Sequence, residues 1–245
     1  MDFRAITMLL VLLGGPDVAW AADYTTDAAL VQAAYNAQNI GDYATAAQDA
    51  ATAAAAGNAQ AQGLLAGMYL TGHGEAHDCS QALHWFDLSA QQGDPQSFYN
   101  LGVLNEHGIC MPRNFTAALA LYKAVAQHGW IEAQINLGNM YGHGEGVKRD
   151  DAEATKWFTL AADQNEPTAQ LDLALLAQAD PVRAEMWMLL ARKNATDLLL
   201  KISIDEKLKA LQAGMKPAQI AQGEALAAAW KPQPPVQPSA QTPGG

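Results

Sequence analysis

The chain has 245 residues and a formal net charge of −11, with 14 Lys and Arg against 25 Asp and Glu. Binding to nucleic acid or to an anionic membrane surface needs clustered cationic side chains, so this charge argues against both kinds of partner. Solubility is the simplest explanation of the acidity, and an acidic recognition surface is the alternative.

Residues 1–21 have the pattern of a secretory signal peptide. Arg4 precedes an apolar run over residues 5–13, and Ala19-Trp20-Ala21 has the small-x-small pattern of a cleavage site. The run is too short to span a bilayer, which takes about 20 apolar residues. We therefore expect cleavage after Ala21 and a periplasmic or secreted protein with no integral membrane segment.

A pattern of residues then recurs at an interval of 36 residues. Tyr69 has a counterpart two intervals later at Tyr141, and Trp85 has one at Trp157. The clearest copy occupies residues 133–162. With a degenerate copy before the clear ones and a truncated copy after them, five units are expected, over residues 30–57, 61–90, 101–129, 133–162 and 173–191.

Each unit is predicted to form two helices. Apolar and small residues recur three and four positions apart on either side of a glycine-rich break, as with Leu65, Met68 and Tyr69 before it and Ala82 and Trp85 after it. A helical hairpin cannot bury its faces alone, so stacking of the units must supply the core. Small residues are expected where paired helices approach, and aromatic residues between units: Ala66, Ala82, Gly102, Ala118, Gly138 and Ala154; Tyr69, Trp85, Tyr122, Tyr141 and Trp157.

These copies resemble the Sel1-like repeat family, a relative of the tetratricopeptide repeats. The family pattern is Ala-x3-Leu-Gly-x2-Tyr-x2-Gly-x-Gly followed by Ala-x2-Trp-x3-Ala-Ala, and the resemblance covers residues 24–193. The second clear copy departs from it at Asn105, Cys110 and Leu121. The resemblance implies an all-α, right-handed superhelical solenoid of stacked antiparallel helix pairs.

The domain organisation follows from this resemblance. The repeat solenoid is expected over residues 22–193 and C-terminal capping helices over residues 194–230, where Met215–Trp230 resembles the helix that closes such arrays. Residues 231–245 are rich in proline and lack helix formers, which predicts a disordered or polyproline-like tail.

The chain has two cysteines, Cys79 and Cys110. Cys110 lies in the expected loop of one unit, and Cys79 lies where the second helix of the preceding unit begins. Stacking of neighbouring units brings these regions together, so we expect a disulfide between them, which an oxidising compartment would permit. Two unpaired thiols are the alternative.

No catalytic or cofactor motif is found. The sequence has no P-loop, no His-Glu-x-x-His and no Gly-x-Ser-x-Gly, so we expect neither an enzyme nor a cofactor. One alternative is an envelope hydrolase that acts on peptidoglycan or β-lactams, which some Sel1-like relatives suggest, although Ser-x-x-Lys is absent.

A metal-binding periplasmic protein is a further alternative, because histidines recur in the expected loops. His107 and His143 are 36 residues apart, and His73 and His77 lie in the loop of the preceding unit. Equivalent positions in stacked helices lie about 9 to 10 Å apart. Ligands of one zinc ion lie about 2 Å from it, so this spacing argues against a shared metal.

The function implied by the resemblance is that of a non-catalytic scaffold in the cell envelope, which binds a protein or an extended peptide; regulation of a signalling or assembly complex is one version of this role. Tetratricopeptide geometry places the binding residues on the inner face, on the first helix of each unit. Aromatic, amide and apolar groups there suit an extended peptide, and a merely solvated face is the alternative. The expected binding residues are Tyr35, Gln38, Asn39, Gln60, Tyr99, Val103, Glu106, His107, Ile135, Asn139 and His143.

Overall fold

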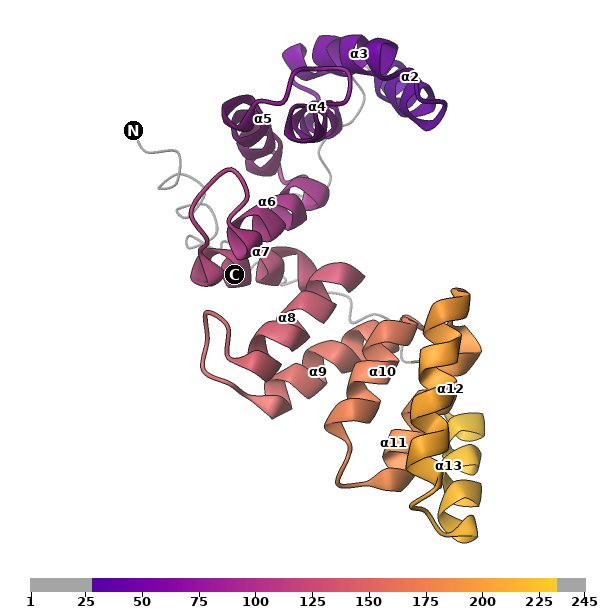
Figure 1. The fold of residues 1–245 in the computed structure, drawn as a ribbon. Coiled ribbons are helices and arrows are strands. Elements are labelled where there is room, and N and C mark those ends of the chain that lie inside the picture. Colours follow the sequence, from indigo (N-terminus) through magenta and orange to yellow (C-terminus); the bar gives the residue numbers. More distant parts are fainter. Residues whose placement is uncertain (1–27, 233–245) are drawn as a thin grey trace, which may run out of the picture. The chain divides into compact units, whose positions relative to one another are not determined.

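The computed structural model describes residues 28–232, and within this range every regular element is an α-helix (Figure 1). The predicted signal peptide and residues 233–245 of the predicted tail lie outside the described residues. The helices are α2 (Ala28–Asn39), α3 (Tyr43–Ala55), α4 (Ala59–Thr71), α5 (Cys79–Gln91), α6 (Pro95–His107), α7 (Phe115–Ala126), α8 (Ile131–His143), α9 (Asp151–Ala162), α10 (Pro167–Leu176), α11 (Pro181–Asn194), α12 (Leu198–Gln212) and α13 (Pro217–Ala229). The predicted all-α class is confirmed.

Consecutive helices pack as antiparallel pairs, so that α2–α3, α4–α5, α6–α7, α8–α9 and α10–α11 form five hairpins. The chain divides into two compact units, which we call unit 1, up to Val125, and unit 2, from Ala126 onward. Within each unit the hairpins also contact one another, as α3 does with α4 and α9 with α10. Packing of hairpin on hairpin therefore builds each core, as the repeat pattern predicts.

Glycines at the 36-residue interval end the first helices. Gly72, Gly108 and Gly144 follow α4, α6 and α8 with φ of 76°, 71° and 76°. This left-handed conformation costs other residues roughly 1–2 kcal/mol, and it lets the amide of each glycine bond the last turn of its helix. The glycines thus fix where each hairpin turns.

Aspartate or asparagine at the same interval starts the second helices. Asp42, Asp78, Asn114 and Asp150 precede α3, α5, α7 and α9, and each side chain accepts a hydrogen bond from a backbone amide in the first turn. Such a cap contributes about 1 kcal/mol to helix stability.

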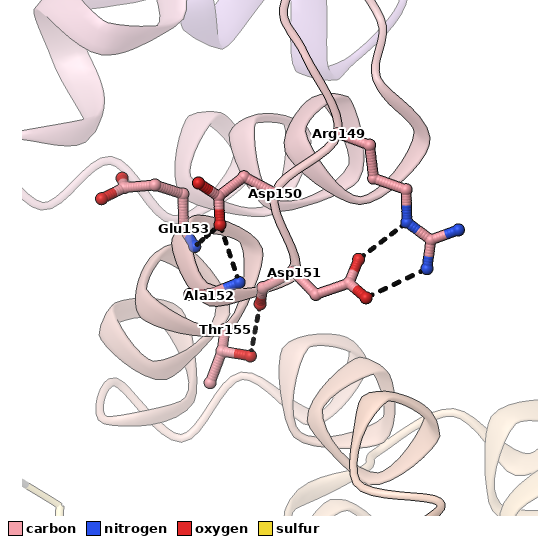
Figure 2. A network of polar contacts seen from close by, with 6 residues as sticks. All are labelled: Arg149, Asp150, Asp151, Ala152, Glu153 and Thr155. Atoms are coloured by element: carbon pink, nitrogen blue, oxygen red, sulfur yellow. Dashed lines mark hydrogen bonds and ion pairs between the residues drawn. The ribbon is translucent and has the colours of Figure 1, made fainter.

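The start of α9 shows the cap in detail (Figure 2). Asp150 Oδ1 accepts from the amides of Ala152 and Glu153 at 3.0 and 3.1 Å. Beside it, Arg149 binds both carboxylate oxygens of Asp151, at 2.9 and 3.0 Å. Both side chains of this ion pair are more than half exposed, so it contributes little to stability, whereas the cap defines the helix start.

Small residues let the paired helices approach, as predicted. A Cβ atom added to Gly102 would lie 2.5 Å from a ring carbon of Tyr122 on α7, and one added to Gly138 would lie 2.5 Å from the ring of Phe158 on α9. The glycines therefore make room for aromatic rings. Trp157 is buried as the pattern predicts, whereas Trp85 is only partly buried, beside the core shared by α2, α3 and α4.

Three buried glutamines link successive helices. Gln62, Gln134 and Gln170 each donate to the carbonyl at the end of the preceding helix and accept from a second amide side chain. The accepting carbonyls are those of Ala54, Ala126 and Ala162, at 3.2, 2.9 and 3.2 Å; the amide donors are Gln92, Gln164 and Asn194, at 2.7, 3.0 and 3.0 Å. Carbonyls at helix ends lack intrahelical partners, so these bonds satisfy groups that burial would otherwise penalise.

Two further helices, α12 and α13, pack on α11 at the C-terminal end of unit 2. Trp230, which follows α13, meets Trp187 of α11 edge to face, with ring centroids 5.9 Å apart. Glu185 of α11 is fully buried below Gly223 of α13 and accepts a hydrogen bond from Gln212 Nε2 at 2.8 Å. The segment expected to cap the array thus covers the last hairpin.

The first prediction compares two glycines of one helix. Gly138→Ala should destabilise the protein by about 1–3 kcal/mol, because the new methyl group overlaps the Phe158 ring. Gly142→Ala is the matched control: its Cβ would lie 3.9 Å from Ala154, an ordinary contact, so the alanine should stabilise α8 by roughly 0.5–1 kcal/mol. Urea unfolding followed by circular dichroism measures both, and equal midpoints would contradict the packing.

A second prediction concerns the pH dependence of stability at Glu185. Burial raises the pKa of its carboxyl, the hydrogen bond from Gln212 opposes this, and Glu224 reinforces it. A raised pKa in the folded state means that stability from this group is present in acid and is lost as the pH rises through that pKa.

Glu185→Gln should therefore raise the melting temperature relative to wild type at pH 7–8, and the difference should vanish in acid. Calorimetry across this range measures it, with Glu206→Gln on the exposed surface of α12 as control. A difference that does not change with pH would show that the carboxyl stays neutral or is solvated.

Candidate functional site

Cys79 and Cys110 form a disulfide with Cα atoms 5.2 Å apart, as predicted from their register. The bond joins the first residue of α5 to the loop that follows α6 in the next hairpin. Cys110 has φ of 63°, and the glycines at its equivalent positions, Gly74 and Gly146, have φ of 82° and 69°. Closing a loop of this length contributes about 3–4 kcal/mol in the chain-entropy account.

The preceding pair of hairpins makes the same junction without a covalent bond. Tyr43, the first residue of α3, occupies the register of Cys79, and a Cβ added to Gly74 would lie 2.1 Å from the carbonyl oxygen of Tyr43. His73 stacks on the Tyr43 ring with centroids 4.5 Å apart. Loop and helix start therefore touch at both junctions, and the disulfide replaces a close backbone contact.

None of the eleven predicted binding residues lies in the core, and we call the surface that they belong to the first-helix face. In unit 1 the exposed residues are Tyr35, Asn39, Gln60 and His107, and the partly buried ones are Gln38, Tyr99, Val103 and Glu106. In unit 2 the exposed residue is His143, and the partly buried ones are Ile135 and Asn139. Each side chain retains contact with solvent, but whether it contacts a partner stays a prediction.

Aromatic groups on the first-helix face of unit 1 are held in place. Tyr35 is 38% exposed, and burial of the remainder, with the charge of Asp94, raises the pKa of its hydroxyl. The Tyr99 ring lies beside that of Tyr122, with centroids 5.7 Å apart. The Tyr122 hydroxyl donates to Glu106 Oε2 at 2.5 Å, so one carboxylate oxygen of Glu106 is engaged by the second helix.

Gly67 on α4 was not singled out by the sequence. Its register positions in α6 and α8 hold Val103 and Asn139. A Cβ added to Gly67 would meet no atom within 4 Å, whereas one added to Gly63, a turn earlier, would lie 2.8 Å from Ser97. Packing thus explains Gly63 and leaves Gly67 with open space above the helix.

Asp172 on α10 is the functional candidate that sequence reasoning missed in unit 2. Burial raises the pKa of its carboxyl to about 6, and the charge of His143 on α8 opposes the shift. The two side chains therefore interact across neighbouring first helices, and Asp172 is a half-buried acid on the face that carries His143.

A chain of hydroxyl groups joins α4, α5 and α6 but cannot serve hydrolysis. The Ser97 hydroxyl donates to Ser89 Oγ at 2.8 Å, and the Ser89 hydroxyl donates to the carbonyl of Ala59 at 2.7 Å. Asp94 accepts from the amide of Ser97 as the cap of α6. Both serines are fully buried, so no substrate reaches them.

The loop histidines do not gather into a metal centre. Within residues 28–232 no three His, Cys, Asp or Glu side chains are grouped to hold an ion. His77 Nδ1 lies 2.8 Å from the carbonyl oxygen of Leu70, and its Nε2 lies 3.7 Å from Cys79 Sγ. Over the same range no helix is long and apolar enough to cross a membrane.

Similarity to known sequences agrees with the repeat register. The Sel1 repeat family matches residues 59–94, 96–130 and 131–166, which hold α4–α5, α6–α7 and α8–α9. A protein of Neisseria meningitidis described as uncharacterized is 34% identical over 108 residues, 44% of this chain and 23% of that one. The HRD3B component of an ERAD-associated E3 ubiquitin-protein ligase from Arabidopsis thaliana is 33% identical over 126 residues, 51% and 19% of the two chains. The chain thus spans only about a fifth of these relatives.

Solved structures share the fold. The protective antigen c5321 of uropathogenic Escherichia coli, which displays an SLR fold, superposes with a TM-score of 0.70 at 27% identity, over 82% of this chain and 44% of that one. A Sel1 repeat protein from Oxalobacter formigenes gives a TM-score of 0.66 at 23% identity, over 81% and 84%. The hairpins, their 36-residue register and the family matches agree, and the chain therefore contains three Sel1 repeats between residues 59 and 166.

Proposed function

We propose that this protein is an exported, non-catalytic scaffold that binds another protein, or an extended peptide from it, along the first-helix face of unit 1. The observation that carries the proposal is the open space at Gly67. Gly67 lies on α4, the first helix of its hairpin. Tyr35 lies on α2 and Tyr99 on α6, the first helices of the hairpins before and after it.

The energetic argument starts from the cost of glycine in a helix. A glycine inside a helix costs roughly 0.5–1 kcal/mol relative to alanine. At Gly63, Gly102 and Gly138, packing offsets this cost, because a neighbouring side chain occupies the space of the missing Cβ. No side chain of the described protein does so at Gly67. A partner backbone that lies against α4 would use this space, with Tyr35 and Tyr99 as anchors on either side.

In unit 2 the same face offers an acid in place of aromatic groups. At neutral pH, Asp172 is mostly ionised beside His143, since its pKa is about 6. A half-buried carboxylate suits a cationic side chain of a partner. We assign this region a supporting role, because a Cβ added to Gly142, on its first helix α8, would still contact Ala154 at 3.9 Å, whereas one added to Gly67 would meet no atom within 4 Å.

The relatives support a role in protein assembly. The similar Arabidopsis protein is by its name a component of a ubiquitin ligase, and the similar protein of Candida glabrata is a component of the same kind. We carry over the role as a component and not the ubiquitin chemistry. The predicted signal peptide and the disulfide support an exported location, where a partner in the cell envelope is the natural target.

A third prediction tests the face directly. A photo-reactive phenylalanine analogue at Tyr99 should capture one envelope protein in cells, because this side chain lies on the proposed binding face. The same analogue at Thr116, an exposed residue of α7 in the same hairpin, is the matched control. Mass spectrometry identifies what is captured, and equal or empty capture at both positions would remove the face as the binding site.

A fourth prediction separates binding from folding. Gly67→Leu should keep or raise the urea midpoint, because leucine favours helix and its Cβ would meet no atom within 4 Å, yet it should abolish capture from Tyr99 by filling the space meant for the partner. Gln81→Leu, exposed on α5, should leave capture unchanged. Undiminished capture by a folded Gly67→Leu variant would refute the role of Gly67.

A further inference from the structure

We propose that the Cys79–Cys110 disulfide is a thiol-exchange site, in which an incoming thiol is joined to Cys110 while Cys79 leaves as a thiolate held by His77. The inference goes beyond the proposed binding and does not depend on it. It rests on the geometry of one imidazole ring, on the position of Cys79 at the start of a helix and on the conformation of Cys110.

The hydrogen bond to Leu70 fixes the role of each nitrogen in the His77 ring. A carbonyl oxygen only accepts, so Nδ1 must carry a hydrogen and donate it across the 2.8 Å separation. Nε2 is left facing Cys79 Sγ at 3.7 Å. In the protonated ring Nε2 also carries a hydrogen, which points at the sulfur. The ring is therefore held where it can pair with a thiolate on Cys79.

The end of α5 adds to this preference for charge on Cys79. Cys79 is the first residue of the helix, where the backbone amides favour negative charge. Cys110 has no such helix start, because it lies in the loop between α6 and α7.

The other charged groups near this junction are accounted for. Asp78 opposes a thiolate, but its carboxylate accepts from the amides of Ser80 and Gln81 as the helix cap. Glu75 and Asp78 both act on the hydroxyl of Tyr69, whose pKa is raised by burial first and by these two charges next.

The loop of Cys110 brings one cation and no acid. The Arg113 guanidinium lies over the Phe115 ring, 4.9 Å from its centroid. Among these groups, His77 is the basic side chain whose ring nitrogen contacts a sulfur atom.

The exchange balances as follows. A thiolate attacks Cys110 Sγ and forms a mixed disulfide with it, while the bond between the two protein sulfurs breaks and its electron pair goes to Cys79 Sγ. The His77 imidazolium pairs with the new thiolate. A second thiolate then attacks the added sulfur and releases Cys110, so that two external thiols become one disulfide and supply the two electrons.

The choice of Cys110 follows from the leaving group. In thiol–disulfide exchange, the thiol with the lower pKa leaves faster, and an imidazolium and a helix start both favour a thiolate on Cys79. Cys110 in turn occupies a left-handed conformation that its counterparts fill with glycine, so release of its tether lets the residue leave a disfavoured region. Exchange therefore breaks the covalent link between the loop after α6 and the start of α5 in the neighbouring hairpin.

The test uses the purified, oxidised full-length protein and glutathione as the thiol. Samples are quenched with an alkylating reagent over time, and mass spectrometry shows which cysteine carries glutathione. In wild type we expect glutathione on Cys110 and the alkyl group on Cys79. His77→Gln keeps a donor for Leu70 but cannot carry a charge, and it should exchange roughly 3–10 times more slowly, because the leaving thiolate loses its partner.

A control variant and a folding check complete the test. His73→Ala, which lies in the same loop but stacks on Tyr43, should exchange at the wild-type rate. Circular dichroism of each oxidised protein checks folding.

Three results would overturn the proposal: glutathione mainly on Cys79, equal rates for wild type and His77→Gln, or no exchange short of unfolding. The first of these needs only wild-type protein, so it stands even if a variant fails to fold.

Discussion

Contact between neighbouring hairpins is the constraint on which the remainder of this protein depends. A pair of helices of about 12 residues each has too little interior to be stable alone, so every apolar face must be matched by the next hairpin. The match is polar as well as apolar. At three junctions a buried glutamine ties the end of one helix to the next, and a carbonyl that loses water on stacking keeps a hydrogen bond.

The junction between the α4–α5 and α6–α7 hairpins lacks this glutamine and has a different polar link. Phe98 stands where the other hairpins have the buried glutamine, and the hydroxyl groups of Ser89 and Ser97 provide the polar link there instead. The disulfide also lies between these two hairpins. Hydrogen bonds between neutral groups contribute about 1 kcal/mol each, so the covalent bond is the larger contribution at this junction.

The sequence was sufficient for the fold because the repeat fixes both the period and the residue types. Glycines at 36-residue spacing located the turns, and the register of Cys79 and Cys110 was enough to pair them. Side-chain environments were harder to predict. The identity of Gly67 is visible in the sequence, but the empty space above it depends on how the helices around α4 pack.

Asp172 and Glu106 illustrate the same limit in electrostatics. The half-buried position of Asp172 beside His143 depends on two helices that are 29 residues apart in the chain at these positions. Glu106 has the register of a binding residue, yet one of its carboxylate oxygens accepts a hydrogen bond from the Tyr122 hydroxyl. This bond forms because the Tyr122 ring packs against Gly102, which places the hydroxyl near Glu106. Periodicity assigns a residue to a face, and only packing decides what else it touches.

The position of the disulfide limits how this protein can change in length. Repeat arrays grow and shrink by gaining or losing whole units. Cys79 and Cys110 lie in adjacent hairpins with Cα atoms 5.2 Å apart. An extra unit inserted between them would separate the sulfurs by about one further helix-packing distance of 8–10 Å, too far for a bond to close. The number of units can therefore vary on either side of this pair but not within it.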